Sequence, residues 1–228
     1  MKKNLKKWAL LLMTAIALPA TTMAQDKVEF SASMPLVSQY IWRGQDLGGV
    51  SLQAEFGLSY KGFSLMAFAS SGFEKNDPEE FDLTLGYETG NFSISLTDFW
   101  CLPDDEEFDY FKYGAHSTSH VFEAQVGYDF GILAANWYTN VYGDDKEYAS
   151  YISLTAPFSL IGLDWEAEVG ATPWGTDYYG TDNFSVCDLS LGASKELNIG
   201  KSFSTTLYAK ATYNPTIEKF YATVGISF

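Results

Sequence analysis

Residues 50–60 read VSLQAEFGLSY, and apolar and polar side chains alternate through the whole stretch. Successive side chains of a β-strand point to opposite faces of a sheet, so this period of two predicts a strand with one apolar and one polar face. The apolar face would carry Val50, Leu52, Ala54, Phe56, Leu58 and Tyr60. The same alternation recurs at 81–88, 163–171 and 220–228.

Turn signals between such stretches divide the chain into about twelve predicted strands. The expected strands are 28–42, 49–60, 62–73, 79–89, 91–101, 119–130, 131–142, 148–158, 161–172, 183–195, 202–213 and 216–228. Every second connection is short, whereas the others, at 43–48, 74–78, 102–118, 143–147 and 173–182, are longer and rich in Asp and Gly. Short turns at one end and longer loops at the other are typical of bacterial outer-membrane barrels.

We therefore predict an all-β fold, a transmembrane up-and-down antiparallel β-barrel of about twelve strands with its turns and both termini in the periplasm. A strand in hydrocarbon must pair every backbone N–H and C=O group, and a closed barrel leaves no free edge. A soluble sandwich or lipocalin-like barrel would also alternate. Such a fold would cover its outer face with Lys and Arg, which are scarce here.

Aromatic residues gather at the predicted strand ends, as they do at the two interfaces of a membrane barrel. The predicted loop-end ring contains Tyr40, Trp42, Phe99, Trp100, Tyr142, Trp174, Tyr178 and Tyr179. The predicted turn-end ring contains Tyr60, Phe63, Tyr87, Phe92, Tyr128, Phe130 and Phe158. Two such rings favour the membrane barrel over a sandwich whose core the same residues would fill.

The first 24 residues, MKKNLKKWALLLMTAIALPATTMA, combine a lysine-rich start, a short apolar run and small residues at the end. This is the pattern of a secretory signal peptide, and the apolar run is shorter than the about 20 residues that a membrane helix needs. We expect a signal peptide at 1–24 and one barrel domain at 25–228, exported to the outer membrane. Cys101 and Cys187 fall on distant predicted strands, which argues against a disulfide between them.

The chain is acidic, with 29 Asp and Glu residues against 14 Lys and Arg residues and a formal net charge of −15. Proteins that bind nucleic acid depend on Lys and Arg to neutralise phosphates, so this balance argues against a nucleic-acid partner. We expect outer-membrane lipids, the barrel-assembly machinery and small polar solutes or cations as partners.

If the apolar faces meet lipid, the polar faces line the lumen and make it acidic. The predicted lumen-lining residues are Glu55, Asp82, Glu88, Glu123, Asp164, Glu166, Glu168, Asp188, Lys210 and Lys219. A water-filled channel with this lining would concentrate cations and disfavour anions. The alternative is a closed structural or adhesin-like barrel whose carboxylates pair with Lys210, Lys219 or Arg43, since twelve strands leave a lumen little wider than side chains fill.

Segments 36–73 and 80–87 resemble the TorF-type family of outer-membrane porins. The likeness is carried by Tyr40, Trp42, Arg43 and Gly44, an aromatic-Arg-Gly element that ends the first strand in that family. Residues 45–49 depart from the Ser/Thr-rich loop expected there. The last strand, which ends in Phe228, is similar to the terminal signal by which outer-membrane barrels are recognised for assembly. The resemblance implies an outer-membrane barrel with a porin function.

The residues give little support for enzyme activity or metal binding in place of solute passage. His116 and His120 share a face if extended but lie about 13 Å apart, too far to hold one metal ion. Ser117 and Ser119 would point to the opposite face, so a lipid-modifying enzyme is the minor hypothesis. The acidic run at 104–109 has the oxygen ligands that Ca²⁺ prefers but is more typical of a solvated loop. We predict no enzyme activity, catalytic residue, cofactor or metal site.

Overall fold

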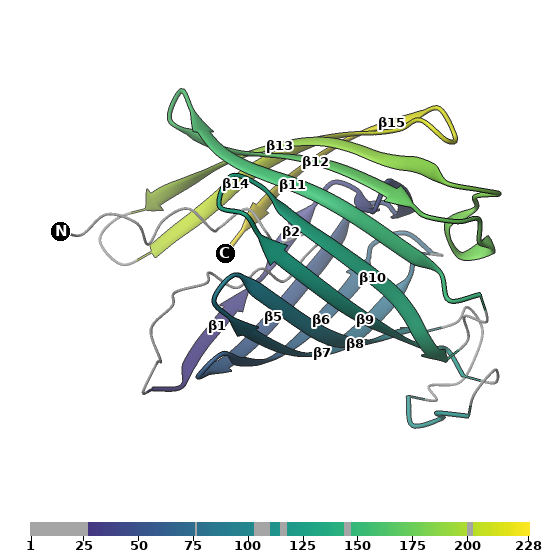
Figure 1. Cartoon of the computed structure of the whole chain (residues 1–228). Helices are drawn as coiled ribbons and strands as arrows, with labels where there is room; N and C mark the ends of the chain where they lie inside the picture. Colours follow the sequence, from purple (N-terminus) through teal and green to yellow (C-terminus); the bar gives the residue numbers. More distant parts are fainter. Residues whose placement is uncertain (1–26, 76, 103–109, 115–117, 144–146, 200–202) are drawn as a thin grey trace.

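The computed structural model describes residues 27–75, 77–102, 110–114, 118–143, 147–199 and 203–228. The chain forms an antiparallel sheet that curls into a barrel of tilted strands (Figure 1). The C-terminus and the short turns lie at one end of the barrel, at the left of Figure 1, and the longer loops lie at the other end. Within the described residues, no helix is long and apolar enough to cross a bilayer.

The wall strands follow one another in chain order around the barrel. They are β1 (Glu29–Ser33), β2 (Pro35–Val37), β5 (Ser51–Tyr60), β6 (Phe63–Gly72), β7 (Glu79–Thr89), β8 (Phe92–Leu102), β9 (His120–Asp129), β10 (Ala134–Gly143), β11 (Ser150–Leu160), β12 (Leu163–Thr172), β13 (Ser185–Ile199), β14 (Phe203–Asn214) and β15 (Lys219–Ser227). Two further strands, β3 (Tyr40–Trp42) and β4 (Gln45–Gly48), form a separate two-stranded sheet. A 3₁₀ turn, η1, covers Asp177–Tyr179 between β12 and β13.

The wall closes where the first strand meets the last. Leu36 of β2 pairs with Ile226 of β15 on one side and with Leu52 of β5 on the other, and β1 continues along β5. With β1 and β2 counted as one strand and β3 and β4 outside the wall, the sheet is a closed barrel of twelve strands. The predicted fold class is confirmed, and closure supplies the backbone pairing that a sheet in lipid requires.

The barrel is apolar outside and polar inside, the reverse of a soluble protein. On β7, Leu85 and Tyr87 are 58% and 37% exposed, whereas Asp82 and Thr84, at the alternate positions, are buried. Most of the buried polar side chains are Ser, Thr, Asn, Gln, Asp or Glu, while large apolar side chains are exposed on almost every wall strand. Such a wall is suited to contact with hydrocarbon and unsuited to water.

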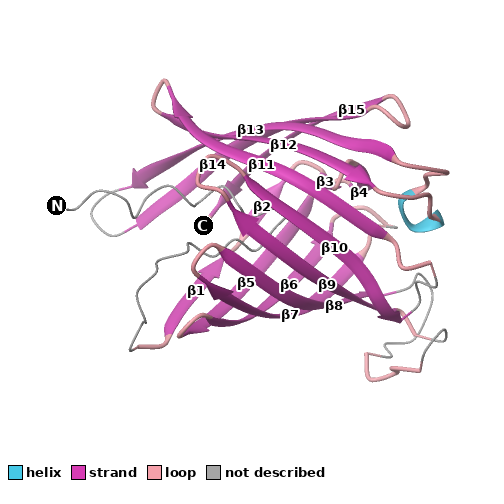
Figure 2. Cartoon of the chain, in the orientation of Figure 1, coloured by secondary structure: helices cyan, strands magenta, loops and turns pink. Residues whose placement is uncertain are grey.

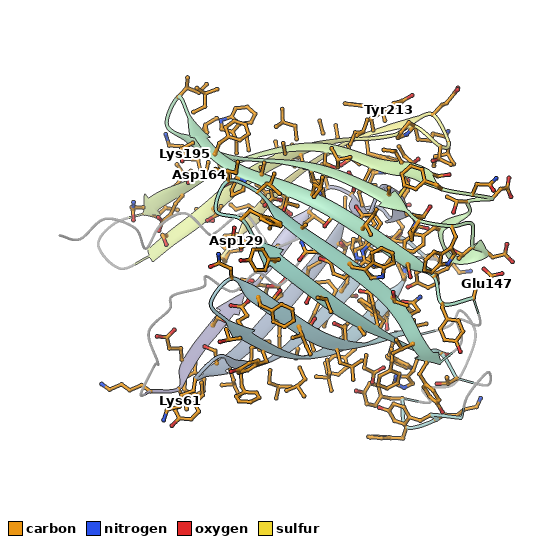
Figure 3. The ribbon with its side chains drawn as sticks, in the orientation of Figure 1. Lys61, Asp129, Glu147, Asp164, Lys195 and Tyr213 are labelled. Atoms are coloured by element: carbon orange, nitrogen blue, oxygen red, sulfur yellow. The ribbon has the colours of Figure 1, made fainter. Side chains whose placement is uncertain are left out.

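The two ends of the barrel carry charge and aromatic rings. Lys61, Asp129 and Asp164 lie at the turn end and Glu147 at the loop end (Figure 3). Every residue of the predicted turn-end aromatic ring is exposed on the surface, and Phe63 also packs against Tyr87 with 4.7 Å between ring centroids. The turn-end ring is therefore present as predicted.

Eleven of the twelve predicted strands agree with the structure to within four residues. The first strand does not. The sequence predicts one strand over 28–42, but the wall strand ends at Val37, and Tyr40–Trp42 belongs to the hairpin of β3 and β4. The predicted loop at 43–48 is correspondingly the turn and second strand of that hairpin.

Other predictions lie outside the described residues: the signal peptide at 1–24, the acidic run at 104–109, and those for His116 and Ser117. Cys101 and Cys187 are free and lie on β8 and β13, as their predicted strands imply. Among the described side chains, no group of three or more His, Cys, Asp or Glu residues is arranged to hold a metal ion.

Candidate functional site

The hairpin of β3 and β4 lies inside the barrel, near the loop end (Figure 2). Trp42 pairs with Gln45, so Arg43 and Gly44 form a two-residue turn, with φ angles of 50° and 75°. Positive φ at both central residues is the geometry of the tight hairpin turn that matches strand twist. We call Tyr40–Trp42, the turn and Gln45–Gly48 together the inner hairpin.

Arg43 at the tip of the inner hairpin is held by the far wall. Its side chain is 2% exposed, and its guanidinium donates to both carboxylate oxygens of Glu123 on β9, with Nη1–Oε2 at 2.5 Å and Nη2–Oε1 at 2.7 Å. Nη1 also donates to the hydroxyl of Tyr179 at 2.6 Å. A bidentate Arg–carboxylate pair fixes both position and orientation, so the tip is anchored rather than merely near the wall.

Three aromatic rings surround the same guanidinium. The Arg43 Cζ atom lies 4.1 Å from the ring centroid of Tyr138, 4.3 Å from that of Trp42 and 4.8 Å from that of Tyr151. Cations are attracted to aromatic faces at such distances, and the attraction is stronger where water is excluded. Tyr138 and Tyr151 belong to β10 and β11, so the tip reaches the side of the wall opposite the strand from which the hairpin begins.

The close approach of the wall at Gly44 explains why the turn has glycine at this position. A Cβ atom at Gly44 would collide with the backbone carbonyl oxygen of Cys187 on β13. The Gly44 carbonyl oxygen accepts a hydrogen bond of 3.0 Å from the Asn214 side chain on β14. At the base of the hairpin, the Tyr40 hydroxyl donates to Glu80 on β7 at 2.8 Å. The inner hairpin is thus fastened to the wall on several sides.

A second group of charges lies next to the Arg43 site. The Tyr151 hydroxyl donates to Glu168 Oε1 at 3.0 Å, and Lys210 Nζ lies 3.6 Å from Glu168 Oε2. Tyr151 also stacks on Tyr179 with 6.0 Å between ring centroids. One connected set of contacts therefore runs from Glu123 on β9 through Arg43 and the tyrosines to Lys210 on β14.

The structure brings most of the predicted lumen residues to the inward face. These are Glu55, Asp82, Glu88, Glu123, Asp164, Glu166, Glu168, Asp188 and Lys210, at the positions that alternate with outward apolar side chains. Lys219 differs, because it is exposed beside the turn between β14 and β15 and is not enclosed with the others. The role of this set in conduction stays a prediction.

Sequence reasoning missed several inward residues, among them Tyr138 and Tyr151 beside Arg43, and Glu80 and Asn140. Glu80 is 9% exposed and binds Tyr40, and Asn140 is 1% exposed and lies opposite Glu123 in the β9–β10 pairing. Glu80 falls at an inward position of an alternating strand, so the period of two was the signal that could have found it. Asn140 precedes a register shift in β10, which alternation alone does not reveal.

The predicted loop-end aromatic ring is wrong for most of its members. Tyr40 and Tyr179 are buried, and Trp42 packs against Phe99 and Tyr178 with ring centroids 5.8 and 6.2 Å apart. Trp42, Phe99, Tyr178 and Tyr179 form an internal aromatic cluster at the inner hairpin, while Tyr40 packs against Phe68. Phe99 lies at an inward position of β8, but alternation cannot place the others, because the hairpin and η1 leave the wall and turn their side chains inward. Tyr142 and Trp174 remain exposed, as predicted.

The charge balance of the inward face is acidic. Glu55, Asp82, Glu88, Asp164 and Glu166 add to the carboxylates that meet Arg43 and Lys210. In the loop at η1, burial raises the pKa of Tyr179 well above its ordinary value, so its hydroxyl stays protonated while it accepts from Arg43. The tip therefore places the permanent positive charge of Arg43 among the acidic side chains of the inward face.

Comparisons with known proteins identify a family. The family model described as "Bacterial protein of unknown function (Gcw_chp)" matches residues 21–224, and the chain belongs to this family. Among solved structures, the chain is similar to one titled "KdgM porin", with a TM-score of 0.49 and 9% sequence identity over 86% of this chain and 97% of that chain. A search of curated proteins found no significant match.

Proposed function

We propose that this member of the Gcw_chp family is an outer-membrane channel for small polar solutes with a preference for cations, and that the inner hairpin forms its constriction. The observation that carries the proposal is the inner hairpin itself: a polar, acidic inward face is crossed by a tip that is anchored on the far wall by Arg43 and Glu123. A constriction at one level of a polar barrel selects solutes by size and charge.

Three further features support an outer-membrane channel. The outward apolar wall suits a bilayer, the turn-end aromatic ring suits a membrane interface, and the tight turns share one end with the C-terminus. The resemblance of 36–73 to the TorF-type porins points the same way. We also propose that 1–24 is the signal peptide and Phe228 the assembly signal of this barrel.

The inner hairpin also favours a second function, a closed barrel that displays its loops. Its tip touches β9, β10, β11, β13 and β14 through contacts of Arg43 and Gly44. A hairpin with so many anchors would block the lumen if it never moved. Single-channel conductance separates the channel from the closed barrel.

The test is single-channel conductance of the purified barrel in planar bilayers under a salt gradient. We expect small discrete steps with a reversal potential that indicates cation preference. Arg43→Met, which loses the ion pair but keeps an apolar side chain, should give larger steps. Lys219→Met removes an exposed positive charge and should leave the step size unchanged. Folded protein without steps in both the wild type and Arg43→Met would overturn the channel in favour of the closed barrel.

A lipid-modifying enzyme gains no support from His120. Its Nδ1 atom lies 2.7 Å from Asp98 Oδ1 and its Nε2 atom 2.6 Å from the carbonyl oxygen of Tyr110. Neither ring nitrogen is directed at a serine hydroxyl, which a His base for nucleophilic catalysis requires.

A further inference from the structure

Residues 110–114 lie against the outside of the barrel wall at the loop end. Glu123 of β9 points inward, so His120, three residues earlier on the same strand, points outward, as do its β8 neighbours Asp98 and Trp100. The ring of Tyr110 covers this outward surface, with its centroid 5.1 Å from that of His120 and 5.4 Å from that of Trp100. We call residues 110–113 the outer flap.

His120 holds the outer flap through both of its ring nitrogens. Nδ1 meets the Asp98 carboxylate, and Nε2 meets the backbone carbonyl oxygen of Tyr110. The carbonyl oxygen of Tyr110 accepts from Nε2, so this ring bonds the backbone of the flap to the wall. Tyr113 stacks on the same ring, with 4.1 Å between centroids.

The other side of the outer flap is aromatic and uncovered. Phe111 is 84% exposed and Tyr113 is 38% exposed. The Tyr142 hydroxyl, on the outward side of β10, donates to the Tyr113 carbonyl oxygen at 3.0 Å. The exposed face of the flap therefore continues the outward wall of β8 to β10, which lipid covers in a membrane barrel.

We propose that the outer flap is a lipid-binding segment that lies in the headgroup region of the outer leaflet, and that His120 positions it there. The partner is the bilayer surface, because Phe111 extends the apolar wall outward and aromatic side chains favour the membrane interface. The flap lies outside the lumen, so the proposal does not depend on passage through the barrel. The flap places Phe111 and Tyr113 at the loop end, where other predicted interfacial aromatic residues lie inside the barrel.

Depth-dependent fluorescence quenching tests the proposal. In a Cys101→Ser, Cys187→Ser background, Phe111→Cys carries an environment-sensitive fluorophore, and the full-length barrel is placed in phosphatidylcholine vesicles with nitroxide labels at defined depths. Phe56→Cys on the middle of the wall is the lipid control, and Glu218→Cys in the β14–β15 turn is the aqueous control. We expect the shallow nitroxide to quench the fluorophore at position 111, and the deep nitroxide to quench the fluorophore at position 56.

Variants of the positioning residues complete the test. In His120→Ala and in Asp98→Asn, quenching at position 111 should be weaker than in the wild type, while quenching at position 56 is unchanged. A second measurement uses Lys112, which gives trypsin a cleavage site in the flap. Cleavage there should be faster in His120→Ala than in the wild type. Absence of lipid quenching at position 111 would overturn the lipid contact, and equal quenching in the wild type and His120→Ala would overturn the role of His120.

Discussion

Strand β9 holds two separate segments of the chain through side chains three residues apart on its opposite faces. Glu123 faces the lumen and binds Arg43, whereas His120 faces outward and binds Asp98 and the outer flap. The Arg43 contact is an ion pair with two hydrogen bonds, while His120 meets the flap through one backbone carbonyl oxygen and ring contacts. The comparison teaches that one strand anchors the inner hairpin on its lumen face and the outer flap on its lipid-facing side.

The largest expected effect comes from breaking the inner contact. Arg43→Met leaves Glu123 buried without its partner, and loss of one member of a buried pair costs about 3–5 kcal/mol. We expect the free energy of unfolding, measured by urea titration in lipid vesicles, to fall by this amount. The double variant Arg43→Met, Glu123→Gln should recover part of the loss, since no unpaired charge remains. A single variant as stable as the wild type would contradict the buried pair.

Gly44→Ala should cause the second-largest loss of stability. Its Cβ atom would meet the Cys187 carbonyl oxygen and its φ is 75°, so strain and overpacking together cost about 2–4 kcal/mol. Gly90→Ala is the matched control, because Gly90 also has positive φ, 61°, with no atom within 4 Å of an added Cβ. The control should lose about 1–2 kcal/mol in the same urea titration. Equal losses would show that the close approach at Gly44 does not matter.

The outer contact should give a smaller effect. Asp98→Asn removes the charged acceptor of His120 and should cost about 1–3 kcal/mol. Urea titration in lipid vesicles measures this loss. Asp129→Asn, at the turn end, should cost less, and an equal loss there would contradict the role of Asp98.

The smallest effect on stability should come from Glu166→Gln. Glu166 lies on the inward face of β12 next to the Glu168–Lys210 pair, so its charge contributes to the acidic lining. We expect a weaker cation preference in the reversal potential, with the free energy of unfolding within about 0.5 kcal/mol of the wild type. Glu79→Gln, an exposed carboxylate at the start of β7, should leave the preference unchanged. An unaltered preference in Glu166→Gln would remove this residue from the ion path.

Sequence alone could not locate the inner hairpin, although a local signal was present. Arg43-Gly44 has the same backbone geometry as the turns Lys61-Gly62 and Ile161-Gly162, with positive φ at both positions. Long strands flank the last two turns, so the alternation on either side marks their positions. The strands around Arg43 are three and four residues long, which is too short for a periodic pattern to stand out.

The sequence by itself determined the barrel, its strands, the turn-end ring and the face on which the acidic residues lie. These follow from the alternation of apolar and polar side chains, which is a local property of each strand, and from the closed backbone pairing that a bilayer requires. Tertiary structure alone decided that Arg43 meets Glu123 and that Tyr110 covers His120. Such contacts join residues 80 and 10 positions apart through closure of the wall and folding of a loop, and no local pattern encodes either distance.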